Sequence, residues 1–218
     1  MPIHVIKAGL FFNVFDPYEA LMKDMEKGAL FVISAPSGAG KSTLIARIRK
    51  IFPHIRYSVS CTSRAPRKGE IEGVHYYFVS RDKFLKMIEG DEFLEWKEVH
   101  GNLYGTPSAP VKEALASARC MILDIDVQGA KEVFKKVPSS VGIFINAPST
   151  AVLQGRLRRR GTDSAESIRT RMANAALEMK QAGMFKHQIV NDDLESAVED
   201  LAGVINKESG HLIPETCL

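Results

Sequence analysis

The fold is decided by the stretch Phe31-Val32-Ile33-Ser34-Ala35-Pro36-Ser37-Gly38-Ala39-Gly40-Lys41-Ser42-Thr43-Leu44-Ile45. An apolar run, typical of a buried strand, ends in a short glycine-rich loop that leads directly into a helical pattern. This is the strand–loop–helix layout of a phosphate-binding P-loop. Glycines let successive backbone N–H groups curl around a phosphate chain, and the following helix points its positive end at the same anion. The stretch therefore predicts a site for nucleotide phosphates.

Two polar side chains at the end of this loop carry the predicted chemistry. Lys41 supplies a mobile charge for the outer phosphates, and the hydroxyl of Ser42 is suited to hold a magnesium ion. The strict pattern has glycine where this chain has Ala35, so the match reads Ala-x-x-x-x-Gly-Lys-Ser. The alternative, a glycine-rich helix entry with a surface lysine, agrees poorly with a strand before the loop and a helix after it.

Composition places the chain among ordinary globular proteins. Its 218 residues, 45% of them hydrophobic, suffice for one sizeable domain with small inserted lobes. A net charge of only +3 argues against a nucleic-acid coat protein, and no apolar run is long enough to span a membrane. The three cysteines, Cys61, Cys120 and Cys217, are too widely spaced for a zinc site or a disulfide framework, so the expected location is a reducing cytoplasm.

The two ends of the chain lack recognisable chemistry. Residues 1–28 are interpreted as an N-terminal extension, and residues 208–218 as a C-terminal tail. The apolar stretch within the extension is too short and too interrupted to be predicted as a secretory signal. Met22 and Met25 stand just before the first core strand, so translation from either is an alternative to Met1. Regulation, source organism and oligomeric state stay open, a homo-oligomer included.

Apolar runs and helical patterns alternate along the rest of the chain. The expected strands are 30–34, 56–62, 74–79, 121–126, 141–146 and 188–191, with a hairpin formed by 92–99 and 103–105. The expected helices are 41–52, 82–88, 110–118, 128–136, 149–158, 163–183 and 193–207, of which Asp163 and Glu166 give the sixth a capping box. This order predicts an α/β protein: a three-layer P-loop fold with a parallel core sheet and an inserted mixed lobe over about 55–106.

Ligands of such folds bind beyond the carboxyl ends of the strands. Asp124 and Asp126 end one predicted strand, and Asn191 and Asp192 end another. We therefore expect these side chains to meet the P-loop at one edge of the sheet.

A second phosphate site is indicated by Ser60-x-x-x-Arg64-x-x-Arg67, with Tyr76 nine residues further on. Guanidinium groups pair bidentately with phosphate oxygens, so two arginines beside hydroxyl groups form a fork for a phosphate. The alternative for this stretch alone is a solvated basic turn.

An acidic pair indicates which base is bound. Glu95, followed by Trp96 and by Tyr104-Gly105-Thr106, is expected to lie across the fold from Asp126. Carboxylates only accept hydrogen bonds, and guanine presents an N–H and an amine side by side where adenine has a bare ring nitrogen. A buried pair of acids therefore favours guanine, although each acid alone could be an ordinary exposed charge.

A third group consists of arginines. The run Arg156-x-Arg158-Arg159-Arg160-Gly161 is followed by Arg169 and Arg171. Phosphoryl transfer spreads negative charge over the equatorial oxygens, which arginines on a closing lid can stabilise. Read alone, a basic run is as consistent with a solvated face or a nucleic-acid patch, but beside a P-loop we favour the phosphate interpretation.

Together these motifs resemble the guanylate kinase family. The resemblance is carried by Ser-Ala-Pro-Ser-Gly-Ala-Gly-Lys-Ser from Ser34, Ser-Arg-Ala-Pro-Arg-x-Gly-Glu from Ser63, Glu-Trp from Glu95, Gly-Asn-Leu-Tyr-Gly-Thr from Gly101, Leu-Asp-Ile-Asp-Val-Gln-Gly from Leu123, Arg-Arg-Gly-Thr from Arg159 and Val-Asn-Asp-Asp from Val190. It covers about residues 28–207, in order and with compatible spacing. The departures are the two ends of the chain and Thr106, where many members carry serine.

The resemblance implies a kinase domain over 29–207 with a GMP-binding lobe at 55–106 and a helical lid at 156–171. The implied reaction is ATP plus GMP giving ADP plus GDP, a step of purine nucleotide metabolism. ATP would be bound by Ala35, Pro36, Ser37, Gly38, Ala39, Gly40, Lys41, Ser42 and Thr43. GMP would be bound by Ser60, Arg64, Arg67, Tyr76, Glu95, Tyr104, Thr106 and Asp126. Lys41, Arg156, Arg160 and Arg171 would be catalytic, and Ser42 and Asp124 would hold Mg²⁺.

Two other functions are weighed against this one. Some proteins of this fold are interaction modules without catalysis, but such modules typically lack P-loop or substrate-site residues that are present here. A kinase for another nucleoside monophosphate is the second alternative, and Glu95 with Asp126 argues against it.

Overall fold

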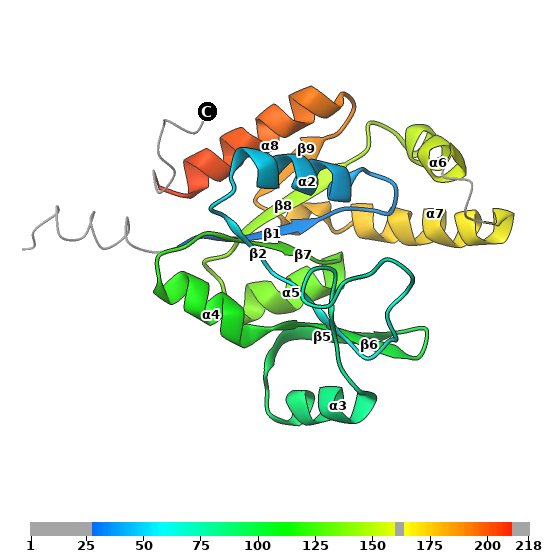
Figure 1. Cartoon of the computed structure of the whole chain (residues 1–218). Coiled ribbons are helices and arrows are strands. Elements are labelled where there is room, and N and C mark those ends of the chain that lie inside the picture. Colours follow the sequence, from blue (N-terminus) through cyan, green and yellow to red (C-terminus); the bar gives the residue numbers. More distant parts are fainter. Residues whose placement is uncertain (1–27, 160–163, 211–218) are drawn as a thin grey trace, which may run out of the picture.

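A computed structural model describes residues 28–159 and 164–210 (Figure 1). The core is a five-stranded sheet in the order β2-β7-β1-β8-β9, and every pairing in it is parallel. Its strands are β1 (Leu30–Ser34), β2 (Arg56–Tyr57), β7 (Met121–Asp124), β8 (Val141–Asn146) and β9 (His187–Val190). All residues of the central strand β1 are buried, as expected for a sheet covered on both faces.

The two faces of β1 pack into separate apolar clusters. Phe31 and Ile33 pack with α2 (Lys41–Ile51) and α8 (Leu194–Glu208). Leu30 and Val32 instead pack with α4 (Ser108–Ala116) and α5 (Val127–Lys136). Successive strand residues point to opposite faces, so α2 and α8 cover one side of the sheet and α4 and α5 the other (Figure 1). The predicted three-layer α/β fold is confirmed.

A second sheet has the order β4-β3-β6-β5. It consists of β3 (Cys61–Thr62), β4 (Tyr77–Phe78), β5 (Phe93–Val99) and β6 (Asn102–Pro107), and α3 (Arg81–Glu89) packs beside it (Figure 1). The rings of Phe84 and Phe93 stack at a centroid distance of 4.4 Å, and they share a small core with Cys61 and Leu103. The mixed sheet has its own core and meets α5 along β5.

Two predicted strands are shorter than expected. The stretch 56–62 is divided between the sheets: Ser58 N–H donates to Ile122 O of the core, whereas the carbonyl of Ser60 accepts from Tyr77 N–H of the second sheet. The stretch 74–79 is a strand only at Tyr77–Phe78. Alternation of side chains marked both stretches as extended, but it does not indicate where a chain leaves one sheet for another.

Helix ends follow their capping side chains. Ser80 caps α3, and Asp193, predicted as the first helical residue, instead caps α8. Asp126 caps α5 by accepting from Gly129 N–H, so β7 ends at Asp124 rather than at residue 126.

The predicted lid, residues 156–171, overlaps the end of α6 (Thr150–Arg159) and the first half of α7 (Ala165–Met179), which the 3-10 turn η1 (Ala182–Met184) follows. Ser164 caps α7, and this helix ends at Met179, earlier than the predicted residue 183. The predictions for Arg160, for Asp163 and for both termini, residues 1–27 and 211–218, lie outside the described residues.

Candidate active site

The P-loop is the turn between β1 and α2, and its backbone requires glycine. Gly38 and Gly40 have φ angles of 95° and 92°, a region that side chains with a Cβ avoid. A Cβ on Gly40 would also lie 2.3 Å from Asn191 Nδ2, which donates to the carbonyl of Ala39 over 2.7 Å. Around this turn lies a cavity of about 260 Å³, lined by Ala35, Pro36, Ser37, Gly38, Gly40, Lys41, Ser42, Thr43 and Glu178.

Lys41 joins the P-loop to the end of β7. Its ammonium lies 2.6 Å from Asp124 Oδ1 and donates to the carbonyl of Ile125 over 3.0 Å. Tyr57 OH donates to the other oxygen of Asp124 over 3.4 Å. Burial, together with the nearby Asp124 charge, raises the pKa of Tyr57. The predicted meeting of Lys41 and Asp124 is thus observed, whereas no sequence motif pointed to Tyr57.

A second cavity, of about 340 Å³, lies between the core and the second sheet. Five of the eight predicted acceptor residues line it, together with Lys41 and Asp124: Ser60, Tyr76, Glu95, Tyr104 and Asp126. The other three, Arg64, Arg67 and Thr106, are not among its lining residues. These side chains come from both sheets and from the loops between them. Lys41 lines both cavities.

Glu95 is held in the cavity wall by its neighbour across β5 and β6. Thr106 OH donates to Glu95 Oε1 over 2.6 Å, and both residues are buried. Burial raises the pKa of Glu95, while Thr106 and Lys97 act in the opposite direction. A Cβ on Gly129 would lie 2.9 Å from Glu95 Oε2, so glycine at that position permits α5 to approach the carboxylate.

Lys97 is a cavity residue that the sequence motifs did not identify. It lies two residues after Glu95 on the same face of β5 and forms an ion pair with Asp126 Oδ2. The other oxygen of Asp126 accepts from Gly129 N–H over 2.8 Å. Burial lowers the pKa of Lys97. Alternate residues of a strand point to the same face. Because Glu95 was predicted to face the site, this spacing could have identified Lys97 as a second residue there.

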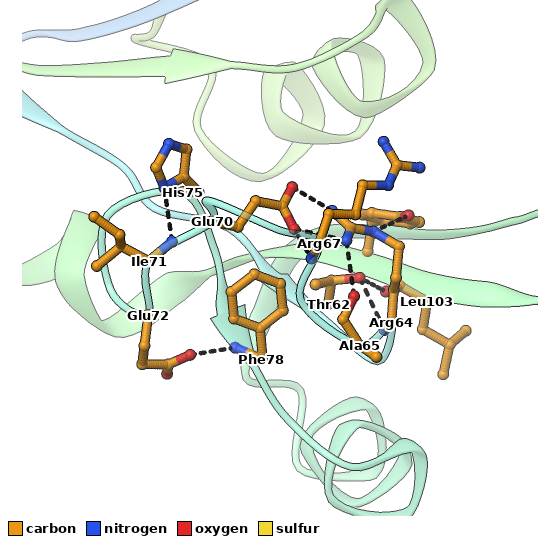
Figure 2. A network of polar contacts seen from close by, with 11 residues as sticks. Thr62, Arg64, Ala65, Arg67, Glu70, Ile71, Glu72, His75, Phe78 and Leu103 are labelled. Atoms are coloured by element: carbon orange, nitrogen blue, oxygen red, sulfur yellow. Dashed lines mark hydrogen bonds and ion pairs between the residues drawn. The ribbon is translucent and has the colours of Figure 1, made fainter.

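The predicted arginine fork is only partly assembled (Figure 2). Arg64 pairs bidentately with Glu70, each N–O distance being 2.8 Å, and its Nε donates to Tyr104 OH over 3.2 Å. Arg67 contributes its backbone N–H to Glu70 over 2.6 Å, while its side chain is exposed and extends away from that carboxylate (Figure 2). Arg64 also lies over the ring of Tyr76, 5.3 Å from its centroid.

Glu70 therefore links the two arginines, a role that the sequence did not reveal. Its hydrogen bonds from the Arg64 side chain and the Arg67 backbone lower its pKa to about 2. The carboxylate occupies the guanidinium face with which a phosphate would pair.

Two arginines of the predicted lid reach the P-loop from two helices. Arg156 of α6 donates to the carbonyl of Asn191 over 2.9 Å and to that of Ala39 over 3.4 Å. Arg171 of α7 donates to Ser37 Oγ over 2.9 Å. Of the predicted cluster of arginines, Arg156 and Arg171 therefore lie at the P-loop.

Glu178 of α7 is a further residue at the P-loop that sequence reasoning missed. It lines the P-loop cavity and accepts from the backbone N–H of Ser37. Burial raises the pKa of Glu178, and the charges of Lys41 and Lys97 oppose that effect. A lone acid near the end of a helix carries no sequence signal for such a position.

A parallel α/β core with a glycine cradle before α2, and a second polar cavity that shares Lys41 with it, define the class of P-loop nucleotide kinases. The family model for guanylate kinase matches residues 27–208. The protein belongs to the guanylate kinase family.

Similar proteins agree with this placement. The chain is 52% identical over 184 residues to the guanylate kinase of Carboxydothermus hydrogenoformans, covering 84% of this chain and 90% of that protein. It is 48% identical over 182 residues to the guanylate kinase of Geobacter sulfurreducens, with coverage of 84% and 90%. The crystal structure of guanylate kinase from Anaplasma phagocytophilum superposes with a TM-score of 0.67 at 33% identity, covering 88% of this chain and 89% of that chain.

Proposed function

We propose that this protein is a guanylate kinase that transfers the γ-phosphoryl group of ATP to GMP, giving ADP and GDP. The observation that carries the proposal is the position of Lys41, which lines both the P-loop cavity and the cavity that contains Glu95 and Asp126. A group transferred between nucleotides in these cavities passes the Lys41 ammonium. Family membership and the names of the relatives support the same reaction.

The donor side of the proposal is the P-loop, residues 35–43. Its backbone N–H groups and the N-terminus of α2 favour an anion. Asn191 and Arg156 both donate to the carbonyl of Ala39 and so stabilise the shape of the loop. ATP phosphates are the ligand proposed here.

On the acceptor side, Glu95 and Asp126 accept from the donor edge of guanine, with Thr106 orienting Glu95. The GMP phosphate lies toward Ser60, Arg64, Tyr76 and Tyr104, and Arg67 joins them. Glu70 pairs with Arg64. A phosphate pairs with the same guanidinium face that this carboxylate contacts.

The proposed chemistry is positioning and charge stabilisation. A GMP phosphate oxygen is itself the nucleophile, so no general base is needed. Lys41, Arg156 and Arg171, joined by Arg160 beyond the described residues, stabilise the negative charge that spreads over the transferring group. Closure of the lid region 156–171 over the lobe 55–106 excludes water, which would otherwise hydrolyse ATP.

Magnesium is proposed as the metal that accompanies ATP. The oxygen donors present fit a hard cation: Ser42 lines the P-loop cavity, and the Asp124 carboxylate forms an ion pair with Lys41, the residue before Ser42. Within residues 28–159 and 164–210, no group of three His, Cys, Asp or Glu side chains could hold a metal by itself. A magnesium ion held mainly by ATP phosphates takes few protein ligands, so it does not require such a group of three side chains. When bound, it would neutralise charge between the outer phosphates.

The cellular setting belongs to the same proposal. Purine nucleotide metabolism in the cytoplasm fits an enzyme that recycles GMP, and Cys61 and Cys120 are free thiols, as is usual in a reducing compartment. Among the described helices, none combines the length and the apolar character needed to cross a membrane.

The test is a coupled assay of ADP formation with GMP, AMP, CMP and UMP in turn. We expect turnover with GMP and little with AMP. Equal turnover of AMP would contradict the guanine assignment. An absence of turnover with every monophosphate, from protein that still binds GMP, would favour an interaction module.

A further inference from the structure

Tyr57 belongs to none of the motifs that carry the family resemblance, yet it contacts a residue of the candidate active site. It ends β2, the edge strand of the core sheet, and pairs with Ile122 of β7. Asp124 lies two residues further along β7, on the same face as Ile122. The Tyr57 hydroxyl donates to Asp124 Oδ2 over 3.4 Å. A side chain of the edge strand thus reaches the carboxylate at the end of the neighbouring strand.

The Asp124 carboxylate is contacted on both of its oxygens. Its Oδ1 lies 2.6 Å from the Lys41 ammonium, and the side chains of Lys41 and Asp124 are 19% and 20% exposed. The terminal torsion of an aspartate is broad, so a single contact leaves the carboxylate free to rotate. Contacts on both oxygens fix the plane of the group, and the Tyr57 hydroxyl supplies the second of them.

The Tyr57 ring is itself held in place. The Arg49 guanidinium lies 4.6 Å from the ring centroid, which is a favourable cation–π contact, and the ring packs against the apolar cluster shared by β1 and α2. The contacts form a closed series that starts and ends on α2 and passes through β2 and β7: Arg49, Tyr57, Asp124 and Lys41. Such a series restricts the movement of Lys41 more than its ion pair alone would.

Tyr57 does not line either of the two cavities that Lys41 lines. Lys41 and Asp124 both line the acceptor cavity. A nucleotide bound there would meet these two side chains directly and would meet Tyr57 only through them. Any effect of the Tyr57 hydroxyl on a reaction in the cavities is therefore transmitted by Asp124 and Lys41.

We propose that Tyr57 is a positioning residue for phosphoryl transfer: its hydroxyl fixes the Asp124 carboxylate and thereby the Lys41 ammonium between the two cavities. This inference rests on the proposed guanylate kinase function. A misplacement of about 1 Å can cost roughly 10²-fold in rate, so a small rotation of Asp124 matters. The effect falls on the step in which charge develops on the transferring group, and ground-state binding changes less.

The experiment removes the hydroxyl alone. Values of kcat, and of KM for ATP and for GMP, are measured for the wild type and for Tyr57→Phe. Tyr77→Phe is the matched control, because Tyr77 of β4 is 40% exposed and lines neither cavity. Asp124→Ala and the double variant with Tyr57→Phe complete a double-mutant cycle, which measures whether the two residues act through each other.

We expect Tyr57→Phe to lower kcat by about 3- to 10-fold, the range for the net contribution of one hydrogen bond. Both KM values should change by less than about twofold, since Tyr57 touches neither cavity. Tyr77→Phe should match the wild type. In the Asp124→Ala background, Tyr57→Phe should cause no further loss. An unchanged kcat in Tyr57→Phe overturns the proposal, and so does an equal loss with and without Asp124.

Two further readings separate this proposal from a structural role and from the proposed function. Urea unfolding of each variant gives its stability, and a Tyr57→Phe protein that is less stable but keeps the wild-type kcat would show a structural role only. A wild type that turns over GMP, with kcat unchanged in Tyr57→Phe, contradicts this inference alone. A wild type that turns over no monophosphate contradicts the proposed function and removes the reaction that Tyr57 is inferred to serve.

Discussion

The carboxamide of Asn191 donates to the carbonyl of Ala39 over 2.7 Å, joining positions separated by 152 residues. Asn191 follows β9, at the edge of the core sheet, and only 5% of it is exposed. Arg156 of α6 donates to the same carbonyl. The P-loop is therefore held in shape by contacts from distant parts of the chain as well as by its own glycines.

Substitution of Gly40 tests this arrangement. Gly40→Ala would place a Cβ 2.3 Å from Asn191 Nδ2 at a φ of 92°. We expect it to lower the free energy of unfolding by about 1–3 kcal/mol and to weaken ATP binding. Gly155→Ala is the matched control: its Cβ would meet nothing within 4 Å in α6, and it should stabilise by about 0.5–1 kcal/mol. Urea unfolding and ATP titration measure both effects.

Removal of Lys41 tests the residue that the two cavities share. Lys41→Ala should lower kcat by at least about 10²-fold, because it removes a charge aimed at the transferring group. Lys50→Ala, an exposed lysine at the end of the same helix, should change kcat little. Steady-state assays with saturating ATP and GMP give the comparison. A loss below tenfold in Lys41→Ala would exclude a central role.

Arg156 and Arg158 lie two residues apart on α6 but differ in their surroundings. Arg156 contacts the P-loop and the end of β9, whereas Arg158 is exposed. Arg156→Ala should lower kcat by about 10²-fold, and Arg158→Ala should leave it nearly unchanged. Similar losses in both variants would indicate a general effect of positive charge on this helix.

Glu95 should determine how GMP binding depends on pH. Burial raises its pKa above the ordinary glutamate value, and only the ionised form accepts from both donors of guanine. As pH falls, kcat/KM for GMP should therefore decline at a higher pH than an ordinary glutamate would give. Glu95→Gln should raise KM for GMP more than KM for ATP and remove this decline. A larger effect on ATP would place Glu95 outside the acceptor site.

Glu70 should contribute to stability in a pH-dependent way. Its hydrogen bonds from Arg64 and Arg67 lower its folded pKa from 4.5 to about 2. A lowered pKa stabilises the fold above the unfolded value, and the contribution is lost as pH falls from about 4.5 to about 2. The difference in Tm between wild type and Glu70→Gln should be full near neutral pH and vanish near the folded pKa. Glu113→Gln, in an exposed pair with Arg56, should show little difference at any pH.

Much of the fold was predictable from local patterns. The apolar run before the P-loop forms β1 with the predicted bounds, because five consecutive buried residues carry a strong signal. The division of residues 56–62 between two sheets was not predictable. That division depends on which carbonyls accept from Ser58 and which donors reach Ser60, and those partners lie far along the chain.

The candidate site was predictable where motifs carried the chemistry. Glu95, Thr106 and Asp126 meet as expected, since each stands in a recognisable motif. Lys97 and Glu178 were missed because isolated charges resemble the solvated surface residues that most lysines and glutamates are. Only the packing of β5 and α7 against the core shows that both face a cavity.

The crossing from the core sheet to the second sheet has a mechanical consequence. Tyr57 ends β2 and Cys61 begins β3, so Ser58, Val59 and Ser60 form a short connector between the core sheet and the second sheet. One inserted residue adds up to about 3.3–3.6 Å, whereas a misalignment of about 1 Å can cost two orders of magnitude in rate. The length of this connector is therefore as constrained as the identity of any side chain in the site.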